Sequence, residues 1–168
     1  MFRSGRARER QGANAAGRLS LLLGLVFFAS PLAAQSTTLA LGGNIITFPT
    51  PTATDYVNGY VYSATGVQFT VKATSDAGQA MMTTVAIKST SANLGNGKLL
   101  ADLQWRRSDV ATWNSIALAN VNVEARSQTY NGVNDPWSNT IFFRMKLSWT
   151  ADAPAVYTAN YTITLSVQ

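Results

Sequence analysis

The sequence of 168 residues contains no cysteine and no histidine. Without them the chain cannot form disulfides, build the usual zinc sites, or carry Ser-His-Asp or Cys-His catalytic machinery. It also has no phosphate-binding loop of the Walker type. We therefore expect a protein that is not an enzyme and that uses no cofactor and no metal ion.

Charged residues are few, at 12% of the chain, and the basic ones gather at the start. Five of the 13 Lys and Arg, but only one of the 8 acids, precede residue 35. Residues 35–168 therefore hold 8 basic and 7 acidic side chains, a net charge of +1. This part lacks the basic footprint of a nucleic-acid-binding protein, so we exclude nucleic acid as its partner.

Residues 1–34 have the three-part pattern of a secretory signal peptide. A basic start is followed by the apolar run Leu19–Ser30 and then by Pro31 and small residues up to Ala34. The run is shorter than the roughly 20 residues that a membrane-spanning helix needs, so an uncleaved anchor is the less favoured alternative. We expect cleavage after Ala34. Residues 35–168 are then exported to the periplasm, the cell surface or the medium, with no stable membrane span.

Apolar and polar residues alternate in most of residues 35–168, which is typical of half-buried strands and not of helices. The predicted inward rows lie at alternate positions of Val67–Ala73, Met81–Ile87, Leu99–Trp105, Val121–Ala125, Ile141–Trp149 and Tyr157–Val167. Turn-forming residues separate the rows, and Asn58-Gly59 is predicted to form a hairpin turn. Asp102 and Glu124 are expected on the outer, polar faces.

This pattern predicts an all-β fold, a single antiparallel β-sandwich of immunoglobulin-like or pilin-like type. We expect seven to nine strands in one domain that covers residues 35–168. A small outer-membrane β-barrel is the competing all-β interpretation, because alternation alone does not separate the two architectures.

The C-terminal segment SWTADAPAVYTANYTITLSVQ resembles the ending of small secreted bacterial β-sandwich proteins related to spore-coat-protein-U and pilus-subunit domains. The matching positions are Pro154, Tyr157 and the strand Tyr161–Val167. Ala155-Val156 stands where a glycine often precedes the tyrosine, and the cysteines of many such domains are absent. The resemblance implies a structural or surface protein, such as a subunit of an extracellular filament or coat, although a fold does not fix a function.

The first residues after the predicted cleavage site form a candidate assembly strand. Thr37, Leu39 and Leu41 alternate with Thr38 and Ala40, ahead of Gly42-Gly43. Pilus-type subunits join by donating such a strand to a neighbour, a form of β-augmentation. The favoured alternative is that this segment is the first edge strand of its own sandwich. If the segment is donated, self-association depends on residues 35–43.

A second class of function, a carbohydrate-binding or adhesive module, rests on the tryptophans. Trp105 and Trp149 are expected in the core, whereas Trp113 and Trp137 fall in irregular stretches. An indole in a polar loop can stack on a sugar ring beside hydrogen-bonding Asn and Asp side chains. The candidate ligand-binding residues are Trp113, Asn114, Asn134, Asp135 and Trp137. The alternative is that these rings cap the end of the sandwich, with Arg106-Arg107 ordering the Trp113 loop through a cation–π contact.

The seven carboxylates of residues 35–168 are dispersed, and most lie near turns, where Asp is common regardless of function. An enzyme that uses paired carboxylates is therefore the least favoured class. Asn131–Asp135 is the nearest approach to a calcium-binding loop, and it has too few acids for one.

Overall fold

The computed structural model describes residues 35–43, 45–75, 80–129 and 136–168, so the predicted signal peptide lies outside the described residues. The elements in chain order are β1 (Gln35–Leu41), β2 (Ile45–Phe48), α1 (Ala53–Asn58), β3 (Tyr60–Tyr62), β4 (Val67–Ser75), β5 (Ala80–Ser89), the 3-10 helix η1 (Leu100–Asp102), β6 (Leu103–Arg107), β7 (Asn114–Ser115), β8 (Val121–Thr129), β9 (Trp137–Lys146) and β10 (Tyr157–Val167). Neither helix in the described part of the chain has the length and apolar character needed to cross a bilayer.

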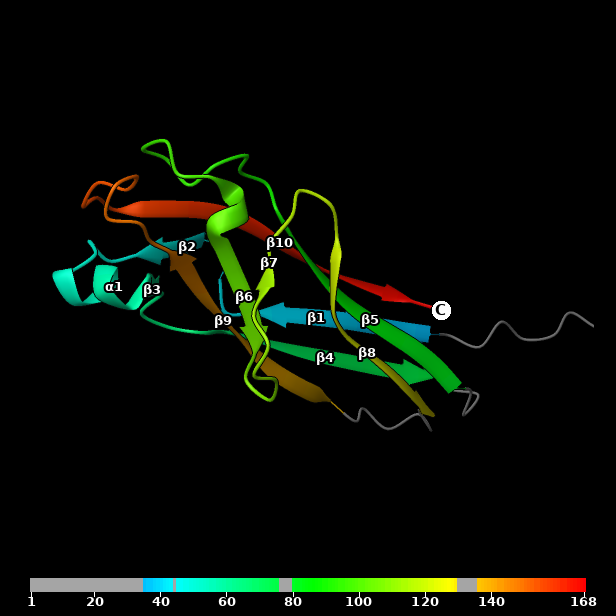
Figure 1. The fold of residues 1–168 in the computed structure, drawn as a ribbon. Helices are drawn as coiled ribbons and strands as arrows, with labels where there is room; N and C mark the ends of the chain where they lie inside the picture. The colour runs from blue at the N-terminus through cyan, green and yellow to red at the C-terminus, as the bar shows by residue number, and fades with distance from the viewer. Residues whose placement is uncertain (1–34, 44, 76–79, 130–135) are drawn as a thin grey trace, which may run out of the picture. The chain divides into compact units, whose positions relative to one another are not determined.

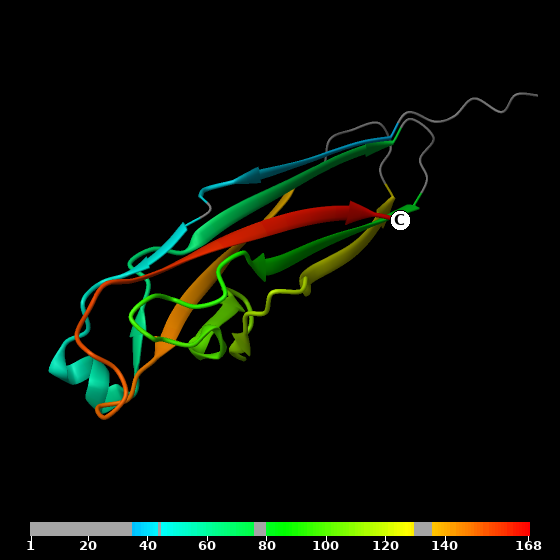
Figure 2. The ribbon, with the colours of Figure 1, turned by 90° about the horizontal axis from the view of Figure 1, so that it is seen from above.

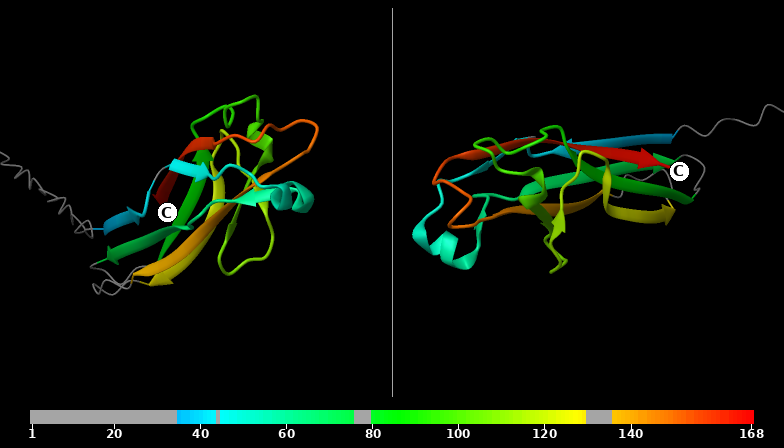
Figure 3. Two further views of the ribbon diagram at one scale, coloured as in Figure 1. Left: turned by 90° about the vertical axis from the view of Figure 1, so that its left-hand side faces the viewer. Right: turned by 45° about the horizontal axis from the view of Figure 1, so that its top comes forward.

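The described residues form two antiparallel sheets, which Figure 1 shows from the side and Figure 3 also shows end-on. The larger sheet, sheet A, has the order β1-β4-β9-β6-β7, with β3 also paired to β9. The smaller one, sheet B, has the order β2-β10-β5-β8. The all-β sandwich is confirmed. Ten strands are described, more than the seven to nine expected, because β3 and β7 are too short for alternation to show.

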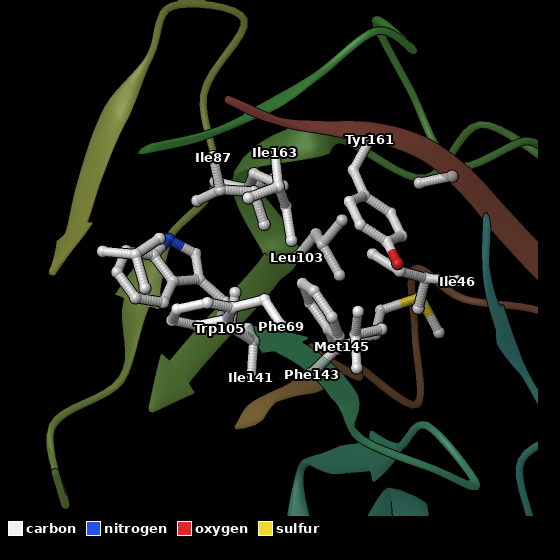
Figure 4. Packing of buried hydrophobic residues seen from close by; sticks show 14 of the residues in the cluster. Ile46, Phe69, Ile87, Leu103, Trp105, Ile141, Phe143, Met145, Tyr161 and Ile163 are labelled. Carbon is white, nitrogen blue, oxygen red and sulfur yellow. The ribbon is translucent and has the colours of Figure 1, made fainter. Parts of the chain in front are cut away.

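The core lies between the two sheets and is built by the inward rows of the long strands. Figure 4 shows Phe69, Ile141 and Phe143 of sheet A facing Ile87 and Ile163 of sheet B. Burial of each such side chain contributes roughly 1.5–3 kcal/mol, which lets the chain fold without disulfides. The predicted inward rows of β4, β5 and β10, and of β9 as far as Met145, are confirmed.

Two predicted strands extend too far in the sequence-based assignment. Leu99 and Ala101 are exposed because η1 precedes β6, so the inward row begins only at Leu103, and Asp102 belongs to η1. At the other end, β9 stops at Lys146, and Trp149 is 61% exposed in the following turn. Its ring stacks on Tyr56 at 4.6 Å, so Trp149 covers α1 and does not enter the core.

The predicted hairpin at Asn58-Gly59 is wrong, because Asn58 ends the helix α1 and Gly59 caps it. Gly59 has φ of 78°, a left-handed conformation that glycine adopts without strain. Thr52 and Asp55 form a capping box at the other end: the Thr52 side chain accepts from the Asp55 amide, and Asp55 accepts from the Thr52 amide. Both ends therefore define a short helix.

A β-bulge in β8 changes which residues of that strand face inward. Val85 pairs with Glu124 and Ala86 pairs with Asn122, so Val123 is the extra residue. As a result Val123 and Glu124 are both buried, whereas Ala125 is exposed. The prediction that Ala125 faces the core and Glu124 faces solvent is therefore wrong, because a bulge reverses the alternation beyond it.

Candidate functional site

Trp113 lies on the outer face of sheet A, within a group of aromatic and arginine side chains. We call this group, Tyr60, Tyr62, Arg106, Trp113, Phe142 and Arg144, the arginine–aromatic cluster. Tyr60 and Tyr62 come from β3, Phe142 and Arg144 from β9, and Arg106 from β6, while Trp113 directly precedes β7. Their alternate neighbours Val61, Phe143 and Trp105 point into the core, so strand alternation places the cluster on the opposite face.

Both arginines of the cluster lie over aromatic rings. The Cζ atom of Arg144 lies 4.4 Å from the ring centroid of Trp113 and 4.9 Å from that of Tyr60. The Cζ atom of Arg106 lies 5.2 Å from the Trp113 centroid and 5.3 Å from that of Phe142. These distances are within the range of cation–π attraction. The expected contact of Arg106 with Trp113 is present, and Arg144 shares the same indole.

Hydrogen bonds from the arginines hold the cluster on the sheet. Arg144 Nε donates to Oε1 of the buried Gln104 at 2.8 Å, across the β6–β9 pair. Arg106 Nη1 donates to the carbonyl oxygens of Arg107 at 3.3 Å and Val110 at 3.1 Å. No carboxylate among the described residues lies within salt-bridge distance of Arg106 or Arg144. Among the residues that the structure describes, the positive charge of the cluster therefore has no acidic counterpart.

A polar network between the sheets fixes the start of the loop that carries Trp113. Asn139 Nδ2 donates to Asp109 Oδ1 at 3.1 Å and to Glu124 Oε2 at 3.0 Å, and its Oδ1 accepts from Ser108 Oγ at 2.8 Å. Arg107 also donates two hydrogen bonds to Asp109, from Nε to Oδ1 and from Nη2 to Oδ2. The hydrogen bonds from Arg107 and then from Asn139 lower the pKa of Asp109 below its ordinary value.

Glu124 is the buried acid of this network, and its charge is balanced. Its Oε1 lies 2.6 Å from Arg126 Nε and its Oε2 lies 3.5 Å from Arg107 Nη1. A buried carboxylate needs such partners, because desolvation otherwise disfavours its charged form. The network was missed from the sequence because Glu124 faces inward only through the bulge in β8. Because each acid of the network is neutralised by an arginine, the role of the network is to position the loop that carries Trp113.

The structure does not bring the three described members of the predicted ligand-binding set, Trp113, Asn114 and Trp137, to one face. Asn114 pairs with Trp105 in the β6–β7 ladder, and paired residues point to the same side of a sheet. With Trp105 it lines a cavity of about 210 Å³ on the side away from the Trp113 ring. Asn134 and Asp135 lie outside the described residues. Of the three described candidates, Trp113 alone therefore contributes to the arginine–aromatic cluster.

Trp137 is not in an irregular loop, because it opens strand β9 and is only 5% exposed. The centroid of its ring lies 5.7 Å from that of Phe69, with the two rings edge to face. The Cζ atom of Arg126 lies 4.4 Å from the Trp137 ring centroid. It therefore closes the core, the alternative stated for this residue, and does not present a face to a ligand. The signal that was missed is the alternation itself, which runs from Trp137 to Met145 without a break.

The predicted assembly strand forms β1 and pairs within its own chain. Thr37, Leu39 and Leu41 lie opposite Ala73, Val71 and Phe69 of β4. Figure 2 shows β1 beside β4 at the margin of the sandwich. The backbone reaches β2 of sheet B through the Gly42-Gly43 link, so the first two strands belong to different sheets. In the single chain, β1 is thus an edge strand of its own sandwich.

Among the described residues no three Asp or Glu side chains come together in a way that could hold a metal ion. No family model, no curated protein and no solved structure matches the chain. The resemblance of the C-terminal strand to spore-coat-protein-U and pilus-subunit domains therefore stays a prediction, and the function is argued from the residues alone.

Proposed function

We propose that the protein is an exported, non-catalytic structural protein of the cell surface that self-associates through the free edge of β1. The observation that carries this proposal is that β1 is a seven-residue edge strand without any protecting feature. Its sequence, QSTTLAL, has no charge, no proline and no bulge, and its outer edge has no strand partner among the described residues. Such edges are ready to pair with another strand.

Most of the other described edges carry devices that prevent edge-to-edge pairing; the exception is Tyr161–Val167 of β10, which β2 does not reach. The strand β8 has a bulge, the inward-facing Glu124 and the charged Arg126. The strands β3 and β7 have three and two residues, and β2 has four and is followed directly by Pro49. Short strands, bulges, charges and proline all discourage pairing. These edges are protected, and β1 is unpaired along its whole outer side, whereas β10 is open only beyond Asn160; this favours β1 as the contact between copies.

An exposed apolar side chain of β1 also favours a contact between copies at this edge. Leu41 at its end is 41% exposed. An edge-to-edge contact that covers it would gain apolar burial as well as backbone hydrogen bonds. Two β1 strands pair antiparallel around a two-fold axis, so this contact by itself gives a dimer. A coat or filament needs a second contact in addition.

The test is the mass of the exported protein by light scattering, compared with that of two lysine variants. Thr38→Lys places a charge on the exposed side of β1, and Thr47→Lys makes the same change on the edge strand β2. We expect dimers or larger assemblies for the wild type and for Thr47→Lys, and monomers for Thr38→Lys. Monomeric wild-type protein at all concentrations would overturn the proposal.

A further inference from the structure

We propose that the arginine–aromatic cluster is a binding site for an acidic glycan, a chain of sugar rings that carry carboxylate or sulfate groups. This site is separate from β1, since the cluster lies on β3, β6, β9 and the residue before β7. The proposal goes beyond self-association. If no acidic glycan binds, the proposed β1 contact is unaffected. If the protein does not self-associate, the proposed glycan site is unaffected.

The charge distribution points to an anionic ligand. Every acidic side chain in the described residues is already engaged. Asp102 and Asp152 pair with Lys98, Asp109 and Glu124 pair with Arg107 and Arg126, and Asp55 caps α1. None of them pairs with Arg106 or Arg144, and Lys146 is exposed two residues after Arg144 on the same strand. Three cations therefore gather on one face of a part of the chain whose net charge is only +1.

The arginines keep donors free for such a ligand. Arg144 uses Nε for Gln104, which leaves both of its terminal amino groups without an acceptor among the described residues. Arg106 uses only Nη1, so its Nε and Nη2 are also free there. A guanidinium fixed by one side and open on the other suits the two oxygens of a carboxylate or sulfate.

The aromatic rings supply the apolar part of the site. The Trp113 ring is half-buried, and Tyr62, 48% exposed, lies 5.9 Å from it at an angle of 44°. Such rings can pack against the apolar face of a pyranose while neighbouring cations bind its acidic group. The cluster extends across three neighbouring strands of sheet A, β3, β9 and β6, and beyond β6 to the residue that precedes β7. A binding surface that crosses several neighbouring strands fits an extended chain of sugar rings.

A single-stranded nucleic acid is the other polyanion that stacks on aromatic rings, and the charges argue against it. Nucleic-acid binding draws most of its affinity from many phosphate contacts and from a strongly positive surface. The cluster has two arginines and one neighbouring lysine, far fewer cations than such a surface needs. Few charges combined with a mixed surface favour an acidic glycan.

The experiment titrates the exported protein with a tetragalacturonate, an oligomannuronate and a heparin tetrasaccharide, with neutral galacto-oligosaccharides and an oligothymidylate for comparison. Binding is measured by calorimetry, and the indole N–H signal of Trp113 is followed by NMR. The variants are Arg106→Gln/Arg144→Gln, Arg144→Lys, and Lys88→Gln, which removes one charge from sheet B as a control. Thr38→Lys is included to separate this site from self-association.

We expect at least one acidic oligosaccharide to bind, to shift the Trp113 indole signal and to dissociate with added salt, while the neutral sugars do not bind. The double variant should lose about tenfold or more in affinity, Arg144→Lys should lose part of it, and Lys88→Gln and Thr38→Lys should stay within about twofold. Failure of all three acidic sugars to bind would overturn the proposal. So would unchanged binding to the double variant, or tighter binding of the oligothymidylate.

Discussion

The guanidinium carbon of Arg144 lies 4.4 Å from the centroid of the Trp113 ring, across a strand that separates their backbones. Because this contact is partly exposed, its cation–π attraction contributes only about 0.5–1 kcal/mol. We expect Trp113→Ala to lower the free energy of unfolding by about 1–2 kcal/mol, which includes the loss of its buried ring area. Urea denaturation measures this change. A loss of several kcal/mol would mean that the ring is part of the core and not of a binding surface.

The buried amide of Asn139 should matter more to stability than any residue of the arginine–aromatic cluster. Its amide nitrogen bridges Asp109 and Glu124, so Asn139→Ala leaves a buried carboxylate oxygen without one of its donors. We expect a loss of about 2–4 kcal/mol in the free energy of unfolding. Asn122→Ala, on the exposed side of the same bulge, is the control and should cost less than about 0.5 kcal/mol. Equal effects of the two substitutions would contradict the network.

Acid should weaken the attachment of the Trp113 loop. The pKa of Asp109 is lowered, so its stabilising contribution is complete above the ordinary value of 3.8 and is lost as the pH falls through the lower, folded-state value. We expect the Trp113 indole signal to change below pH 3.8 in the wild type. Asp109→Asn should remove this change, because its amide does not titrate. A persistent acid transition in the variant would assign the effect to another group.

Alkali should act on Tyr161, which ties sheet B to the link between β1 and β2. Its hydroxyl donates to the carbonyl oxygen of Gly43 at 2.7 Å, and burial raises its pKa from 10.0 to about 12. The contribution of this tyrosine is complete below pH 10 and is lost as the pH rises through about 12. We expect Tyr161→Phe to be less sensitive than the wild type in this range. Unfolding followed by circular dichroism at several pH values checks it, and parallel curves would contradict it.

The sequence predicts well those strands whose side chains alternate without interruption. The rows of β4, β5 and β10 point inward as expected, because each has one buried and one exposed face. Prediction fails where local structure breaks the alternation. Val123 in the bulge turns Glu124 inward, and η1 removes Leu99 from the predicted strand before β6. Bulges depend on pairing with the partner strand, which a period-two pattern does not contain.

The candidate site was predictable only in part. Trp113 was singled out, and its contact with Arg106 follows from the short distance between them in the sequence. The contribution of Arg144 depends on the pairing of β6 with β9, two strands that lie about 35 residues apart in the chain. The alternation that buries Trp137 is present in the sequence, but the polar residues around it favour an irregular loop. Sequence reasoning identified the residue types, and the sheet order decided which of them meet.

The most direct test of self-association is a disulfide crosslink, which the absence of native cysteine makes specific. Thr38 is the central residue of β1, so in the antiparallel register that pairs all seven residues of both β1 strands the two copies of residue 38 lie opposite each other. Cα atoms in such pairs are about 4.5–5.5 Å apart, within the range of a disulfide. We expect Thr38→Cys to form a crosslinked dimer under mild oxidation, and Thr47→Cys on β2 to stay monomeric in a denaturing gel. No crosslink at residue 38, or equal crosslinking of both variants, would contradict assembly through β1.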